Sequence, residues 1–308
     1  MPKFLPERPL YSRERLIVGY PVFAVFLLLF LTRLFGMKLP LPTDSLLFKL
    51  ICELLVFLLP TLLFLFTVGV GTTRRMRLHA PHAMQIPFLI AALFVLVCGC
   101  MLLSILCGGT SSLGNSATVF QSVSAANPWQ ALLMVPVLAI LPAVLEELFF
   151  RGVLIAEYER RGAIRAVIMS ALLFSLCHFD LRNLPVYLFS GLLFALALLA
   201  TDSLVATVIL HAVYNTLSLF SQRYLNAFYE FTGSLELFLF LLILVFLVAL
   251  ILLCRAGAKL YRLRIEAGLG DPRRAVPRHV QLYTTLDALA DPPILLCLVL
   301  SVVGFIVL

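Results

Sequence analysis

Residues 235–254 read LELFLFLLILVFLVALILLC, a run of twenty residues in which Glu236 is the one charged side chain. A bilayer core about 30 Å thick takes roughly 20 apolar residues per helical crossing, so this run predicts a transmembrane helix. Comparable apolar stretches lie near 16–35, 45–68, 84–107, 129–150, 163–178, 184–200, 204–221 and 292–308. We therefore expect an all-α fold, a polytopic transmembrane helix bundle of eight or nine spans, with 292–308 barely long enough to cross.

The overall composition leads to the same class. The 308 residues are 62% hydrophobic and 13% charged, whereas soluble domains are about 45–50% apolar and about 25% charged. This excludes a water-soluble protein. The net charge of +7 is not evidence for a nucleic-acid partner, because the basic residues lie between the hydrophobic stretches. The expected partners are the lipid bilayer and a membrane-associated peptide or protein substrate, with no nucleic acid.

Three clusters of basic residues predict the topology. They lie before the first span, after the second and after the eighth: Arg8, Arg13, Arg15; Arg74, Arg75, Arg77; and Arg255, Lys259, Arg262, Arg264, Arg273, Arg274, Arg278. Cytoplasmic loops carry such an excess of Lys and Arg, and two and six spans separate the clusters. We expect a bacterial inner (cytoplasmic) membrane protein with a cytoplasmic N-terminus and a retained first span. The 108–128 loop and the polar flanks 36–44 and 222–234 are then outside.

The chain reads as one membrane domain, 1–308, because no period of 20–50 residues repeats and no soluble domain is visible. The basic segment 255–290 is expected to be cytoplasmic. Its alternation of Arg with apolar residues suits a helix on the anionic leaflet, and a solvated loop fits equally well. The seven cysteines lie in or beside apolar stretches, where Cys behaves as a small hydrophobe, so we expect no disulfide framework and no zinc finger.

Ionisable residues inside a membrane are costly and are functional candidates by default. The first group is Glu146 and Glu147, which point about 100° apart on a helix, while Glu147 and Arg151, four residues apart, share a face. Arg151 is thus expected to neutralise Glu147 and leave Glu146 free. An Arg at the end of a span can instead extend its charge to the membrane surface. Glu53, in the second span, is interpreted as structural.

Two more groups follow on later spans. Phe174 and His178 lie one turn apart at the end of one span, and His211 and Asn215 share a helical face on another. A lone intramembrane His or Asn often serves only as an interhelical hydrogen-bonding group. The concentration of all these polar residues within about 70 positions favours a common pocket formed by three helices.

The ordered motifs Glu-Glu-x-x-x-Arg, Phe-x-x-x-His and His-x-x-x-Asn resemble those of the CAAX protease and bacteriocin-processing family of intramembrane endopeptidases. The run Thr201-Asp202-Ser203-Leu204 is similar to the family's Thr-Gly-Ser-Leu, with Asp in place of Gly. The resemblance covers about 128–222 and implies a catalytic core there. It implies a glutamate-dependent protease in which a Glu and a His activate water while a His and an Asn stabilise the oxyanion.

We assign the roles on the residues as follows. Burial disfavours the charged form of a carboxyl, so Glu146 is expected to accept and return a proton, with His178 orienting or sharing the water. His211 and Asn215 are the oxyanion donors, and Asn can donate at any pH. Glu147, Arg151 and Phe174 support the site, and no metal and no cofactor are expected.

Other activities remain open. Glu and two His residues can hold zinc with one open position, although the His-Glu-x-x-His signature is absent. A thiol mechanism through Cys177 and His178 is weaker, because adjacent helical residues diverge by about 100°. The same buried Glu and His groups can form a proton relay in a transporter, although no inverted repeat is visible. A non-catalytic membrane chaperone or scaffold is the third alternative, and the intact motifs count against it. The substrate, whether a prenylated C-terminal peptide, a secreted peptide precursor or a regulatory membrane protein, is not specified.

Overall fold

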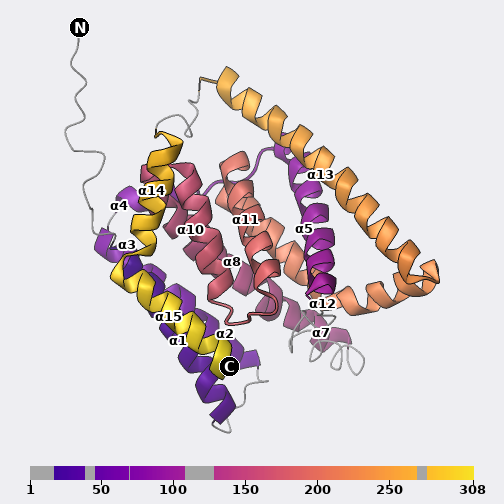
Figure 1. The fold of residues 1–308 in the computed structure, drawn as a ribbon, viewed down its shortest axis with the longest axis horizontal. Helices are drawn as coiled ribbons and strands as arrows, with labels where there is room; N and C mark the ends of the chain where they lie inside the picture. Colours follow the sequence, from indigo (N-terminus) through magenta and orange to yellow (C-terminus); the bar gives the residue numbers. More distant parts are fainter. Residues whose placement is uncertain (1–16, 39–45, 69, 108–127, 269–275) are drawn as a thin grey trace.

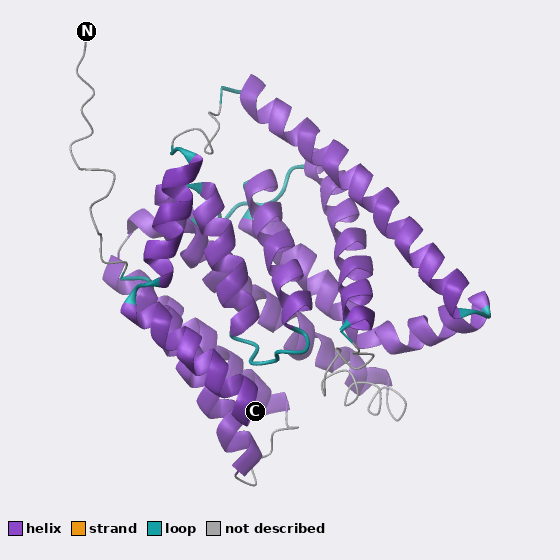
Figure 2. Ribbon diagram, in the orientation of Figure 1, coloured by secondary structure: helices purple, strands orange, loops and turns teal. Residues whose placement is uncertain are grey.

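The computed structural model describes residues 17–38, 46–68, 70–107, 128–268 and 276–308. In these ranges every regular element is a helix and there is no strand (Figure 2). The predicted all-α fold is therefore confirmed. The basic residues at 8, 13 and 15, the 108–127 part of the predicted outer loop and the basic residues at 273 and 274 lie outside the described residues.

The helices follow the predicted apolar stretches closely. In the first half they are α1 (Gly19–Lys38), α2 (Leu46–Glu53), η1 (Leu54–Leu58), α3 (Leu59–Val68), α4 (Val70–Arg75), η2 (Ala83–Gln85) and α5 (Ile86–Leu106). The central helix is a succession of α7 (Pro128–Val135), η3 (Pro136–Ile140), α8 (Leu141–Glu147), η4 (Leu148–Leu154), α9 (Ile155–Tyr158) and η5 (Glu159–Arg161). The remainder are α10 (Ala163–Leu176), α11 (Leu184–Thr201), α12 (Leu204–Thr232), α13 (Leu235–Glu266), α14 (Arg278–Leu289) and α15 (Pro292–Val307).

Helix length limits how many of these helices can cross a bilayer. Within the described residues, six helical stretches are long and apolar enough, or seven if α14 and α15, bent by 68°, count as one span. The expected eight or nine spans are slightly more than this. Helix α10 has 14 residues and rises only about 21 Å at 1.5 Å per residue, short of the roughly 30 Å core. The chain is an integral membrane protein with several apolar helices.

The helices that carry the motifs pack together in the middle of the molecule. Figure 1 shows α8, α10 and α11 between the α1 and α15 pair on one side and the α5 and α13 pair on the other. Helix α10 packs on α11, α12 packs on α8, and α11 packs on α5. The buried aromatic rings of Phe149, Phe150, Phe174 and Phe194 belong to the main hydrophobic core. The polar motif residues therefore lie beside a tightly packed apolar cluster.

Two π-helical segments interrupt the central helix on either side of the glutamates. Element η3 begins at Pro136, and η4 begins directly after Glu147. Proline has no N–H to donate to the helical ladder, and Pro136 and Pro142 both lie in this helix. Single π turns in α-helices occur frequently at functional sites. The wider turn after Glu147 rotates the side chains of Arg151 and the following residues about the helix axis, relative to those before it.

A group of ion pairs joins segments at one end of the bundle. The Arg77 guanidinium contacts a carboxylate oxygen of Glu159 at 2.7 Å and one of Asp202 at 2.7 Å. Arg264, near the end of α13, lies 3.6 Å from the same Asp202 oxygen. The 71–83 loop and the basic end of α13 thus share one end of the bundle, as their charge predicts. That this end faces the cytoplasm stays a prediction.

Candidate active site

Glu147 joins two of the three motifs. Its Oε1 atom accepts from Arg151 Nη1 at 2.9 Å and lies 2.9 Å from His211 Nδ1. The Glu147 and Arg151 side chains are each 0% exposed and His211 is 5% exposed. The predicted pair of Glu147 and Arg151 is confirmed as a contact, and the additional bond to His211 was not predicted.

Arg151 is held by more than its carboxylate partner. A second guanidinium nitrogen donates to the carbonyl of Gly191 on α11 at 2.9 Å. The guanidinium carbon lies 4.5 Å from the ring centroid of Phe174 and 5.2 Å from that of Phe194, within the range of cation–π attraction. The buried guanidinium thus has two hydrogen-bond acceptors and two aromatic neighbours, and Arg151 does not extend to the membrane surface.

His178 lies just beyond the end of α10, in a fixed orientation. Its Nδ1 atom is 2.7 Å from the carbonyl oxygen of Phe174, and its ring stacks on Tyr187 at 3.8 Å with 17° between the planes. A carbonyl oxygen only accepts, so Nδ1 carries the hydrogen, and in the neutral ring Nε2 is left as an acceptor. The backbone carbonyl of His178 accepts from Arg33 of α1.

The Phe174 ring lies between the two histidines. Its centroid is 5.0 Å from that of His178 and 6.0 Å from that of His211, both in edge-to-face arrangements. The His211 imidazole is also stacked on the Phe194 ring, with 4.4 Å between the ring centroids. Aromatic packing therefore fixes both imidazoles, and the residues from α8, α10 and α12 converge as predicted.

Glu146 has surroundings different from those of its neighbour. The side chain is partly exposed, and among the described residues no hydrogen bond or ion pair holds its carboxyl. It interacts electrostatically with Glu53, Glu147 and Arg151. This is the unpaired carboxyl that the sequence predicts, although it lies in a strongly charged environment.

Asn215 is one turn beyond His211 on α12 and faces the central helix. Its Nδ2 atom lies 3.4 Å from the carbonyl oxygen of Ala139 in η3. That distance is at the long end for a hydrogen bond, and the side chain is partly exposed. The amide group therefore has a weak partner that another acceptor can replace.

Several residues at the site were missed by the sequence reasoning. Tyr187, Gly191 and Phe194 repeat at spacings of four and three along α11, which places them on one face. This helical spacing, on the stretch that follows the histidine motif in the sequence, is the pattern that predicts a shared face for these three residues. Glu53, interpreted from the sequence as structural, interacts electrostatically with Glu146 and with Arg33, and this depends on how α2 packs against α8.

The arrangement of the possible metal ligands and of the Cys177 thiol bears on the metal-dependent and the thiol mechanisms. Across the described ranges, no group of three or more His, Cys, Asp and Glu side chains is arranged to hold a metal ion. The Cys177 thiol donates to the Phe174 carbonyl at 3.1 Å and is 3.7 Å from His178 Nδ1. Because that nitrogen already carries a hydrogen bonded to the same carbonyl, it cannot accept the thiol proton in this arrangement.

Comparison with known proteins gives a match over the central part of the chain. Residues 128–217 match the family model described as type II CAAX prenyl endopeptidase Rce1-like. The stretch contains all seven site residues that the sequence predicts, and the match confirms the resemblance found in the motifs. No curated protein and no solved structure matches the chain.

Proposed function

We propose that this chain, whose residues 128–217 match a type II CAAX prenyl endopeptidase family, is an intramembrane endopeptidase that cleaves a membrane-associated or lipidated peptide. The contact of Glu147 with His211, residues separated by 64 positions, carries the proposal most directly. It brings two of the family-like motifs into one buried polar group. If these polar residues served only as independent interhelical hydrogen-bonding groups, residues of two motifs would have no reason to contact each other.

Water activation is assigned to Glu146 and His178. The Glu146 carboxylate accepts a proton from water, and the hydroxide oxygen attacks the carbonyl carbon of the peptide bond. His178 orients the water through Nε2, the nitrogen that the Phe174 carbonyl leaves as an acceptor. Glu146 then returns the proton to the amine as the carbon–nitrogen bond breaks. Such general acid–base catalysis contributes typically about 10²–10⁴-fold in rate.

Oxyanion stabilisation is assigned to His211 and Asn215. Glu147 Oε1 accepts from Arg151 beside its contact with His211, and we assign His211 Nδ1 as the donor in that contact. The other nitrogen, Nε2, donates to an oxyanion only when the ring is an imidazolium. Glu147 holds the His211 ring in its orientation through the 2.9 Å contact and is therefore a positioning residue. Asn215 supplies a second donor by exchanging its long contact with Ala139 for the oxyanion.

A cleavage assay in proteoliposomes tests the activity. Wild-type protein should release peptide fragments after exhaustive treatment with a chelator, and Glu146→Gln should release none. Comparing the membrane peptides of cells that carry wild type with those of cells that carry Glu146→Gln would identify the substrate in the same design. Loss of wild-type activity on chelation, restored by stoichiometric zinc, would instead support the metalloprotease. Proton flux without cleavage would support a transporter.

A further inference from the structure

A long apolar groove runs along the outer side of the α5 and α13 pair, away from the candidate active site. It has a volume of about 860 Å³. Its floor includes the buried Ala91 and Ala249, whose small side chains leave depth between the helices. Its walls are large exposed apolar residues: Ile90, Phe94, Leu244, Val245, Val248 and Leu252.

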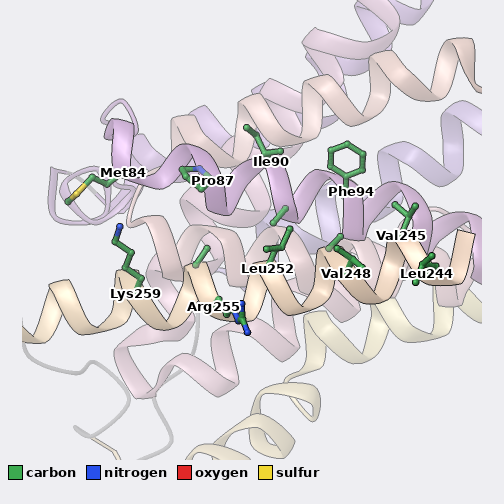
Figure 3. A pocket seen from close by; sticks show the side chains of 13 residues that line it. Met84, Pro87, Ile90, Phe94, Leu244, Val245, Val248, Leu252, Arg255 and Lys259 are labelled. Atoms are coloured by element: carbon green, nitrogen blue, oxygen red, sulfur yellow. The ribbon is translucent and has the colours of Figure 1, made fainter. Parts of the chain in front are cut away.

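Two cations line one end of this groove. Lys259 extends toward the beginning of α5, near Met84 and Pro87, and Arg255 lies one turn nearer the middle of α13 (Figure 3). No acidic residue lines the groove. Neither cation has an ion-pair partner within the described part of the chain. The lining is thus apolar over most of its length and positive at one end.

The cations lie at the depth of lipid headgroups. The apolar run 235–254 of α13 rises about 30 Å, which matches the hydrocarbon core, so Arg255 comes directly at its edge and Lys259 one turn beyond. The groove extends along α13 from Leu244 to Lys259, a rise of about 22 Å. That length covers one leaflet of about 15 Å together with the headgroup layer above it.

We propose that this groove binds an anionic glycerophospholipid, with an acyl chain along the apolar walls and the phosphate on Arg255 and Lys259. Basic pockets between transmembrane helices are suited to anionic headgroups. A second copy of the chain is a poorer occupant, because two parallel copies related by an axis along the membrane normal would bring their cations together at the same depth. The site shares no residue with the candidate active site and does not depend on the proposed protease function.

Native mass spectrometry of purified protein with added phosphatidylglycerol or phosphatidylethanolamine tests the proposal. The wild type should bind phosphatidylglycerol at least about tenfold more tightly than the zwitterionic lipid. Each Lys or Arg near an anionic surface contributes about a factor of five. The double variant Arg255→Gln with Lys259→Gln should therefore bind phosphatidylglycerol about 30-fold more weakly.

The matched control removes the same charge elsewhere. Arg262→Gln with Arg278→Gln changes two exposed cations outside the groove and should leave binding unchanged. Val248→Trp, on an exposed wall position, should obstruct the groove and weaken binding without lowering the melting temperature. Equal binding of the two lipids by the wild type, or equal loss in both double variants, would overturn the proposal. So would a dimer that dissociates only in Val248→Trp.

Discussion

At the scale of single residues, the adjacent glutamates are expected to differ in role because their partners differ. Glu147 is enclosed with Arg151 and His211, whereas Glu146 is partly exposed and unpaired among the described residues. Glu146→Gln should abolish turnover and leave the melting temperature near that of the wild type. Glu147→Gln should lower stability by about 3–5 kcal/mol, the cost of removing one partner from a buried ion pair. Purified yield, thermal unfolding and turnover measure both.

The role of Glu147 beyond stability can be tested by steady-state kinetics. Glu147→Gln alters the contact that orients the His211 ring, so the folded fraction of this variant should show a lower kcat. Glu147→Asp, which keeps a carboxylate, should recover part of that kcat. An unchanged kcat in folded Glu147→Gln with reduced yield would mean that Glu147 is structural only.

Asn215 tests the assignment of the oxyanion donors. Loss of one such donor costs about 10²–10³-fold in kcat, so Asn215→Ala should lower kcat by that amount with a smaller change in KM. Asn215→Asp should be at least as damaging, because a carboxylate repels the developing negative charge. Steady-state kinetics on folded variants decide the matter. A change confined to KM would assign Asn215 to substrate binding.

At the scale of elements, the turn between α11 and α12 shows how Asp202 occupies a position where glycine is the usual residue. Asp202 has φ of +56° at the end of α11, a conformation in which Asp is one of the few tolerated residues other than Gly. Its carboxylate also contacts Arg77 and Arg264. Asp202 thus allows the turn and also forms ion pairs across the end of the bundle.

This turn yields a paired prediction. Asp202→Gly removes the ion pairs, which are partly exposed and worth about 0–1 kcal/mol each. It also removes the steric cost of the left-handed backbone conformation at this position. Its melting temperature should stay close to that of the wild type. Asp202→Ala loses the same contacts and adds a left-handed conformation costing about 1–2 kcal/mol, so it should melt lower. Equal melting temperatures for the two variants would show that the left-handed conformation at position 202 does not affect the stability of the protein.

At the scale of the whole molecule, the orientation in the membrane is the untested expectation. Single cysteines at Ala80, in the loop held by ion pairs, and at Phe231, near the turn that precedes α13, are both at exposed positions. On a cysteine-free background, a membrane-impermeant maleimide should label position 80 only after the cytoplasmic side is opened. It should label position 231 in intact cells. The reverse pattern would invert the predicted topology.

The sequence alone determined the features that depend on local pattern. Apolar runs such as 235–254 identified the helices, because burial in a bilayer requires continuous hydrophobicity over a fixed length. The pairing of Glu147 with Arg151 followed from their spacing of four on one helix. The number of crossings was slightly overestimated, because short helices such as α10 are apolar without being long enough to span.

Only the tertiary structure decided which partners the motif residues have across helices. The contact of Glu147 with His211, the stacking of Tyr187 on His178 and the electrostatic interaction of Glu53 with Glu146 each join residues on different helices. Helical periodicity defines which face a residue occupies, but not which other helix packs against that face or at what depth. Those relations arise from side-chain packing between distant segments, which no local pattern encodes.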